Sequence, residues 1–366
     1  MILNVEYRHK NNFENFFLSV KNKRVAVMFD LNTKPFALPI IKELKDNGIM
    51  TVEIFFPAEE LIPTGENCDL AYNLANGCDY LLAVGSGTLN DMGKYVSTRL
   101  SIPCGVLATA ASMDGYCSKG AALMFDGVKV TKDVNTPKDV LIDLEIIRNA
   151  PKQMTASGFG DIVGKYTCLT DWEMANVVKG EKINQKAFKM MEQARADCLN
   201  AYQDLTKYDP DAVAKLMDAL IMAGLAMAEC GNSRPASGSE HHISHYLEMD
   251  FVKRGEKVPL HGVKVAIGTL ISIELYNYLK DNKIQFNGCE KVYNLVEKLP
   301  TVKEIESMLV GMGCPIRFSQ IGVGREVMEG AIEKAHTVRD RYTVLTLINE
   351  LGLTEKVKPI LMEKFY

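Results

Sequence analysis

The first 130 or so residues alternate between short, fully apolar runs and segments with apolar residues at helical spacing. Short apolar runs favour strands that are buried on both faces of a parallel sheet, and the amphipathic segments between them favour covering helices. The predicted strands are residues 25–29, 51–56, 79–85 and 103–109, and the predicted helices are residues 34–48, 68–78 and 89–101. This alternation predicts a doubly wound α/β domain with a parallel sheet.

After about residue 150 the pattern changes to long helical windows separated by Gly and Pro. The predicted helices are residues 185–205, 211–230, 264–282, 289–299 and 325–352. A chain of 366 residues is also too long for one ordinary core. We therefore expect an α/β domain over residues 1–150 and an all-α domain over residues 151–366.

Composition narrows the class of protein. The net charge is −4 and no basic block is present, so nothing favours nucleic-acid binding. No apolar run approaches the ~20 residues that span a bilayer, and the first residues lack the layout of a signal peptide. The nine cysteines are scattered without a CxxC pair, which fits a reducing compartment. We expect a cytoplasmic protein without a membrane span that forms a homo-oligomer, a dimer.

A glycine-rich turn follows the third predicted strand and opens a predicted helix. Glycines allow close approach of a ligand, and the N–H groups at a helix start suit a pyrophosphate. The pattern is GxGTxxD rather than the usual GxGxxG, and such turns are also common without a ligand. The candidate cofactor-binding residues are Gly85, Ser86, Gly87, Thr88 and Asp91, and Asn90 and Asp91 can also cap the helix.

Two further loops carry candidate binding groups. Asp30 ends the first strand, where a carboxylate can accept from an adenosine ribose hydroxyl and favour NAD over NADP; a turn or cap aspartate is the alternative. The loop at 108–120 follows the fourth strand, at the sheet edge where ligands bind. Thr109 and Ser112 offer hydroxyls there, and Asp114 offers a carboxylate for a substrate hydroxyl or for an Asp-Gly turn.

Three histidines crowd the start of a predicted helix in SGSEHHISH. His241 and His245 are four residues apart and share a helix face, whereas His242 points elsewhere. His261 opens the next apolar run, and Asp161 follows a Phe-Gly turn at the predicted start of another helix. One carboxylate with two imidazoles leaves open positions on a metal, as catalytic sites do. Each histidine alone is more often a surface residue or a satisfied core residue than a metal ligand.

Six stretches, in this order, resemble the sn-glycerol-1-phosphate dehydrogenase family, in particular its bacterial, AraM-like branch. That family belongs to the iron-containing alcohol dehydrogenase and dehydroquinate synthase superfamily. The stretches are VGSGTLND (84–91), TAASMDGY (109–116), GFGDIVGKYTCLTDW (158–172), SGSEHHISH (237–245), HGVKVAIGT (261–269) and AHTVRDRYT (335–343). Together they cover nearly the whole chain, and their common order makes the resemblance specific.

The resemblance implies an NAD(P)-binding N-terminal domain and a helical, metal-binding catalytic domain. By position, the metal ligands are Asp161, His241 and His261. The family metal is zinc, or nickel in the bacterial branch, and the ligand types also suit ferrous iron. The loop from Gly85 to Asp91 is expected to bind the NAD(P) pyrophosphate, Thr109 and Ser112 to lie along the cofactor, and Asp114 to face the substrate hydroxyls.

The implied reaction is the reversible reduction of dihydroxyacetone phosphate to sn-glycerol 1-phosphate by NAD(P)H, in phospholipid metabolism. The metal is expected to polarise the oxygen on carbon 2 for hydride transfer. We predict His245 as a proton relay to solvent, with a hydrogen-bond partner of the metal site as the alternative. Lys165, one turn after Asp161, is predicted to bind the phosphate, with Arg339 and Arg341 as further candidates.

Three positions depart from the family pattern. Val263 stands where members often have Glu, His242 where an apolar residue is usual, and Lys119 where small or apolar residues are common. Glycerol dehydrogenase, which needs no phosphate site, is therefore kept as an alternative. Dehydroquinate synthase is less favoured because we expect a glutamate at its first metal position. A non-catalytic relative is the third alternative, and intact ligand candidates argue against it.

Overall fold

The computed structural model describes residues 3–8 and 12–366, and the chain forms two compact units. The first unit comprises residues 1–111, 115–151 and 208–224, and the second comprises residues 112–114, 152–207 and 225–366. The units therefore do not follow a single cut in the chain. A domain boundary between residues 150 and 151 stays a prediction.

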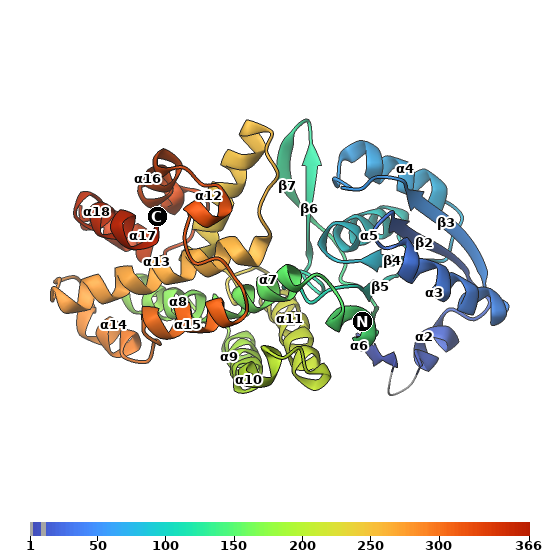
Figure 1. Cartoon of the computed structure of the whole chain (residues 1–366), viewed down its shortest axis with the longest axis horizontal. Coiled ribbons are helices and arrows are strands. Elements are labelled where there is room, and N and C mark those ends of the chain that lie inside the picture. The colour runs from blue at the N-terminus through green and yellow to red at the C-terminus, as the bar shows by residue number, and fades with distance from the viewer. Residues whose placement is uncertain (1–2, 9–11) are drawn as a thin grey trace. The chain divides into compact units, whose positions relative to one another are not determined.

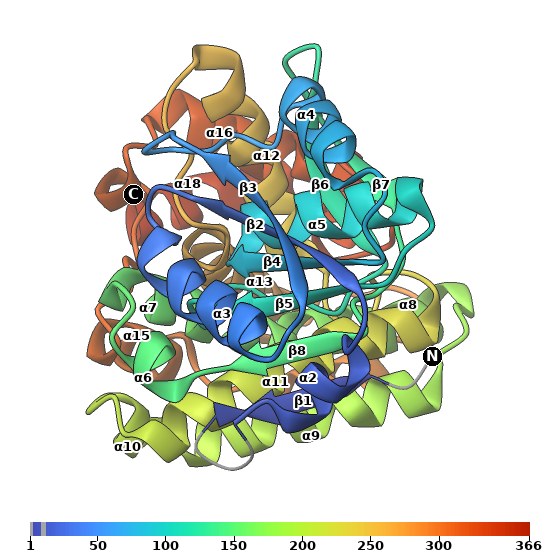
Figure 2. The ribbon, with the colours of Figure 1, turned by 90° about the vertical axis from the view of Figure 1, so that its right-hand side faces the viewer.

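The first unit contains a six-stranded sheet in which all neighbouring strands are parallel. Across the sheet the strands follow the order β1-β8-β5-β4-β2-β3 (Figure 2). Their bounds are β1 (Asn4–Tyr7), β2 (Arg24–Asp30), β3 (Met50–Phe56), β4 (Tyr80–Gly85), β5 (Cys104–Ala108) and β8 (Asp139–Ile142). The predicted parallel α/β class is confirmed, and the four predicted strands correspond to β2 to β5.

Helices cover both faces of this sheet. The helices of the unit are α2 (Glu14–Ser19), α3 (Lys34–Asp46), α4 (Gly65–Ala75), α5 (Gly87–Leu100), α6 (Leu144–Arg148) and most of α11 (Pro210–Cys230). Along β2, Val25, Val27 and Phe29 pack with residues of α2 and α3, whereas Ala26 and Met28 pack with residues of α4 and α5. Alternate side chains of one strand thus enter two separate cores, which is why the strand is apolar throughout.

The apolar pattern did not predict β1, β8, α2 or a two-stranded antiparallel hairpin formed by β6 (Gly120–Phe125) and β7 (Val128–Asp133). β1 and β8 have only four residues each, too few to show a period. β7 is largely exposed and carries charged residues, so it lacks the apolar run of a buried strand.

The second unit is helical, and its elements run from green to red in Figure 1. They are α7 (Lys152–Val163), α8 (Lys165–Lys179), α9 (Gln185–Asn200), α10 (Tyr202–Leu205), α12 (Ser239–Arg254), α13 (His261–Asp281), α14 (Cys289–Val296), α15 (Val302–Gly311), α16 (Arg325–Lys334), α17 (Val344–Glu350) and α18 (Thr354–Phe365), together with the end of α11 (Pro210–Cys230). Helix α13 is buried over most of its length and packs against α7 and α12. Among the described residues, no helix is long and apolar enough to cross a membrane.

The predicted single helix over residues 325–352 is wrong. Helix α16 ends at Lys334, a 3₁₀ turn covers Ala335–Thr337, and α17 begins only at Val344. The stretch between them, residues 338–343, contains two arginines and an aspartate and is not helical. The new start is fixed from outside, because the Val344 N–H donates to Asp171 Oδ1 at 2.8 Å.

Replacement of Met28 by Ala tests the core between the sheet and α4/α5. Met28 is fully buried, so we expect Met28→Ala to lower the free energy of unfolding by about 2–5 kcal/mol. Met50 is 64 % exposed, and Met50→Ala should change it by less than about 0.5 kcal/mol. Urea unfolding followed by circular dichroism measures both variants, and equal effects would contradict this packing.

Candidate metal centre

The close approach of α7 and α13 brings Asp161 and His261 together. Each ligand candidate sits beside a glycine at the crossing, because a Cβ on Gly160 would collide with the Gly262 carbonyl and one on Gly262 with the Ser157 carbonyl. Ser157 Oγ also accepts from the Gly262 N–H at 3.0 Å, which satisfies one N–H of the first turn of α13.

The expected Phe-Gly turn before Asp161 is not present. Phe159 and Gly160 are helical residues of α7, and Asp161 lies within that helix rather than at the start of one. Gly160 is required by the close approach of α13 and not by a turn. A Phe-Gly pair is therefore compatible with a helix here, and the predicted turn is wrong.

Two buried carboxylates fix the start of α12. The Gly238 N–H donates to Glu240 Oε1 at 2.6 Å, and the Ser239 N–H donates to Asp171 Oδ2 at 2.7 Å. The N-cap residue of α12 is Gly238, which has no side chain to cap the helix. The two carboxylates accept from the N–H groups at the helix start instead. Because the first turn is held, the orientation of the following residue, His241, is set as well.

The side chains of Asp161, His241 and His261 form a cluster within the second unit that could hold a metal ion. One ligand atom from each lies within 4.8 Å of the other two. His241 Nδ1 lies 2.7 Å from Glu240 Oε1, and a carboxylate oxygen accepts, so Nδ1 carries the hydrogen. The other ring nitrogen, Nε2, lies 3.6 Å from Asp161 Oδ1. A second partner that fixes the tautomer in this way is typical of metal-bound histidine.

Burial keeps both imidazoles neutral, the form that binds a metal. It lowers the pKa of His261 to about 3, helped by the charges of Lys264 and His245. The pKa of His241 is also held well below its usual value by burial and by Lys165. The same desolvation, followed by the charge of Asp171, raises the pKa of Glu240 to about 7.

Lys165 links the metal candidates to Asp114. Its Nζ donates to Asp114 Oδ2 at 2.6 Å, Asp161 Oδ1 at 2.9 Å and the Ala236 carbonyl at 2.8 Å. Burial alone lowers the pKa of Lys165, but the two carboxylates together hold it above its usual value. Burial also raises the pKa of Asp114. With both carboxylates ionised, the three side chains carry one net negative charge, which suits a bound cation.

His245 lies beside the cluster on the same face of α12. Its ring centroid is 6.3 Å from that of His241 and 6.1 Å from that of His261. Its Nε2 lies 3.1 Å from Arg339 Nη2, and since a guanidinium only donates, Nε2 accepts. Arg339 is not a metal candidate, so the proton relay through His245 and its alternative as a hydrogen-bond partner of the metal site both stay predictions.

The glycine loop lies in the first unit, where the sheet topology favours a nucleotide. The chain runs from β2 outward to β3 and then returns to β4 on the other side of β2, so the order reverses between β2 and β4. Asp30 and Gly85 end these two strands. Ser86 makes no side-chain cap bond to α5, which leaves the first-turn N–H groups available to a phosphate. A glycine turn at a helix start is typical of phosphate-binding loops, and the role of these residues in binding NAD(P) stays a prediction.

Other expected cofactor residues have protein partners. Asp30 Oδ1 accepts from the Thr33 N–H and hydroxyl, as in a turn. The expected cap by Asn90 and Asp91 is wrong: Asn90 donates to the Gly115 and Tyr116 carbonyls, and Asp91 accepts from the Ala122 N–H and pairs with Lys94. Both side chains bind backbone groups of the segment after β5, and the sequence around Asn90 does not predict those partners.

Thr109 and Ser112 fall in different units. The Thr109 N–H donates to the Gly85 carbonyl at 3.2 Å within the first unit, and Ser112 accepts from Ser157 Oγ within the second. Both residues are buried. Their place along a cofactor stays a prediction.

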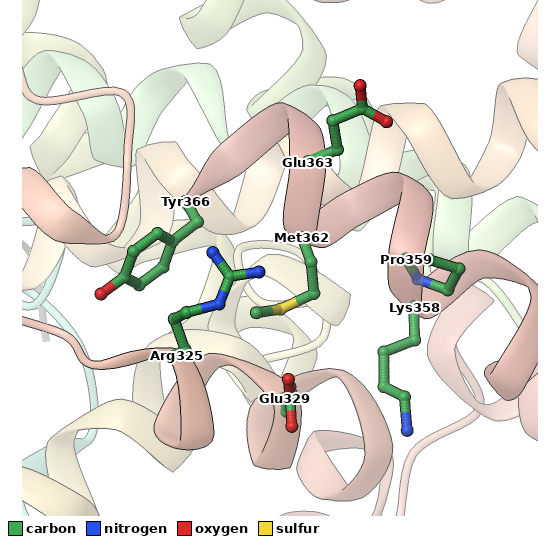
Figure 3. A pocket seen from close by; sticks show the side chains of 7 residues that line it. All are labelled: Arg325, Glu329, Lys358, Pro359, Met362, Glu363 and Tyr366. Atoms are coloured by element: carbon green, nitrogen blue, oxygen red, sulfur yellow. The ribbon is translucent and has the colours of Figure 1, made fainter.

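A pocket of about 560 Å³ between α16 and α18 lies on the second unit (Figure 3). Its lining residues are Arg325, Glu329, Lys358, Pro359, Met362, Glu363 and Tyr366. None of them is a metal or cofactor candidate, so this pocket is not the candidate site.

Comparison with known proteins identifies the family of this chain. The family model "iron-containing alcohol dehydrogenase" matches residues 8–151. A Bacillus licheniformis protein named glycerol-1-phosphate dehydrogenase, NAD(P)+, is 35% identical over 343 residues, covering 92% of this chain and 86% of the relative. A Pyrococcus furiosus protein of the same name is 32% identical over 74% of this chain and 71% of its own. The chain belongs to the glycerol-1-phosphate dehydrogenase family.

Solved structures agree on the fold of this family member. Glycerol dehydrogenase from Schizosaccharomyces pombe superposes with a TM-score of 0.71 at 18% identity, over all of this chain and 92% of that one. An iron-containing alcohol dehydrogenase from Thermococcus thioreducens gives a TM-score of 0.72 at 16% identity over both whole chains. An α/β domain followed by a helical domain is thus the fold of this family member.

Sequence reasoning missed two residues of the site in this glycerol-1-phosphate dehydrogenase family member. Glu240 holds the His241 ring, and Asp171 joins the starts of α12 and α17 and accepts from the Tyr276 hydroxyl at 2.6 Å. Glu240 could have been found as the acid directly before a candidate ligand. Asp171 gave no such signal, since its partners lie far away in the sequence.

Removal of one ligand tests the metal centre. We expect His261→Ala to weaken metal affinity by more than the ~10- to 100-fold typical of an outer hydrogen-bond partner, because one of three protein ligands is lost. His336→Ala, a histidine outside the cluster, is the matched control. Metal content after dialysis against graded chelator measures both variants, and equal retention would contradict the site.

Glu240→Gln tests the orientation of His241. The amide keeps the size of the side chain but loses the charge that accepts from Nδ1, so we expect metal affinity to fall by ~10- to 100-fold. Glu297→Gln, at an exposed position after α14, serves as the control. The same chelator competition measures the effect, and unchanged affinity in Glu240→Gln would show that another contact sets the ring.

Proposed function

We propose that this protein is an NAD(P)-dependent sn-glycerol-1-phosphate dehydrogenase that reversibly reduces dihydroxyacetone phosphate. The observation that carries the proposal is the cluster of Asp161, His241 and His261 in a chain 35% identical to relatives of that name. Substrate and cofactor are taken from those names, and the residue roles from the geometry.

A divalent metal held by the three ligands would supply Lewis-acid stabilisation of negative charge on the reacting C2 oxygen. The ligands differ in what they need from the chain. Glu240 holds the His241 ring, the Asp114 N–H and Lys165 hold the two oxygens of Asp161, and the helix crossing at Gly262 holds His261. The geometry is therefore fixed before substrate binds, which lowers the cost of orientation.

Two side chains beside the ligands act on the substrate in this proposal. The Asp114 carboxylate, held by Lys165, accepts from a substrate hydroxyl. His245 delivers or removes the hydroxyl proton, because it is the titratable ring that borders both imidazole ligands and is itself partly exposed. Zinc, nickel and ferrous iron all suit the ligand set.

The nicotinamide cofactor would supply or accept the hydride. We propose that its pyrophosphate lies on the loop from Gly85 to Thr88, at the start of α5. Asp30 would then face the adenosine ribose and favour NAD, although its Oδ1 is already engaged by Thr33. Cytoplasmic location, a homodimer and a role in phospholipid metabolism complete the proposal; the nine free cysteines support a reducing compartment.

NADH oxidation by metal-loaded protein tests the function. We expect dihydroxyacetone phosphate to be strongly preferred over dihydroxyacetone, with zinc or nickel, and the activity to be lost in His261→Ala but kept in His336→Ala. NADPH in place of NADH measures the cofactor preference. A preference for dihydroxyacetone would instead identify a glycerol dehydrogenase. No oxidation of NADH or NADPH with either ketone, in protein that retains metal, would overturn both functions.

A further inference from the structure

Two arginine side chains converge on one hydroxyl next to the candidate metal centre. Arg339 Nη1 donates to Ser233 Oγ at 3.1 Å, and Arg341 Nη2 donates to the same oxygen at 3.0 Å. Arg341 also donates to the Ser237 carbonyl. All of these residues belong to the second unit. Arginines of like charge are thus held side by side by a neutral acceptor.

Among the described residues, neither guanidinium forms an ion pair with a carboxylate, although the charge of Glu248 acts on Arg339 and that of Glu240 on Arg341. No carboxylate there lies within 4.0 Å of Arg339 or Arg341, whereas their neighbour Arg234 pairs with Glu181 at 2.9 Å. Burial, followed by the charges of Arg234 and Arg339, lowers the pKa of Arg341 to about 10, so it stays protonated at neutral pH. Partly buried cations whose close acceptors are all neutral are costly, and a bound anion would lower that cost.

Several polar groups around the arginines also lack a partner among the described residues. Ser233 Oγ accepts from both arginines, which uses the two acceptor sites of a hydroxyl. Its O–H remains as a donor for a third group. The buried Ser237 Oγ, Arg234 Nη1 and both ring nitrogens of His242 have no hydrogen-bond partner. His242 lies within electrostatic reach of Arg341 and Arg339. Arg234 Nη1 and the hydroxyls of Ser233 and Ser237 are thus donors that a bound oxyanion could engage.

The arginines lie one side chain away from the metal candidates. Arg339 Nη2 donates to His245 Nε2 at 3.1 Å, and the His245 ring borders both His241 and His261. A three-carbon substrate with its reacting oxygen at the cluster would need to reach past one side chain, His245, for its phosphate to meet Arg339. Lys165 is less suited, because an ammonium has three N–H groups and its Nζ already has three acceptors.

We propose that Arg339, Arg341 and Ser233 form the subsite that binds the substrate phosphate, and that Lys165 instead positions Asp114 and Asp161. The proposal rests on the proposed function in one respect, that the anion is a phosphate ester. Planar guanidinium groups bind phosphate oxygens in pairs, which also fixes the end of the substrate that faces away from the metal.

The kinetic test uses the metal-loaded full chain with NADH or NADPH, whichever it oxidises. The measured quantity is the ratio of kcat/KM for dihydroxyacetone phosphate to kcat/KM for dihydroxyacetone. Arg339→Gln should lower this ratio on the order of 100-fold, mainly through KM, since a hydrogen bond to a charged group is lost. Ser233→Ala should lower it less, and Arg254→Gln, an exposed arginine paired with Asp250 on α12, should leave it unchanged.

A binding test separates this proposal from the proposed function. Inorganic phosphate is titrated calorimetrically into the metal-loaded protein with its cofactor loop saturated by oxidised cofactor. Binding to the wild type that is lost in Arg339→Gln supports the subsite even if neither ketone is reduced. No phosphate binding to the wild type, or equal binding and an equal ratio in a folded Arg339→Gln variant, would overturn it. If Arg339→Gln fails to fold, Ser233→Ala in the same two measurements decides.

Discussion

The cluster of candidate metal ligands depends on the close crossing of α7 and α13. Gly160 and Gly262 have no side chains at the point of contact, and a methyl group on either would collide with backbone of the facing helix. The residues that follow Gly160 and precede Gly262 are Asp161 and His261, so the crossing itself brings a carboxylate and an imidazole together. Because both positions are glycine, the two helices approach closely enough for the candidate ligands to meet.

A second constraint is the accounting of buried charge. The start of α12 is held by Glu240 and Asp171, and Asp161 and Asp114 share the ammonium of Lys165. Each carboxylate has defined donors, so these groups can be buried without prohibitive desolvation. The arginines differ in the same way. Arg234 pairs with Glu181, whereas the hydrogen-bond acceptors of Arg339 and Arg341 among the described residues are all neutral. An anion is what that pair lacks.

The apolar pattern predicted an element correctly where the burial of that one element determines its sequence. The apolar runs at 25–29 and 79–85 correspond to β2 and β4, because central strands of a parallel sheet are buried on both faces. The pattern failed for β1 and β8, which are too short to show a period, and over 325–352, where a hydrogen bond to Asp171 starts a new helix. Asp91 shows the same limit, since its partner Ala122 lies beyond the next strand.

The sequence by itself determined the α/β class, the helical second half and, through six ordered motifs, the family and the residues Asp161, His241 and His261. The fold class follows from local periodicity, and the family and the candidate ligands follow from the identity and order of the motif residues. Only the tertiary structure decided that Gly160 serves a helix crossing, that Glu240 orients His241, and that Lys165 has its three N–H groups engaged. Such contacts join residues far apart in sequence, and their energy depends on burial and distance, which no local pattern carries.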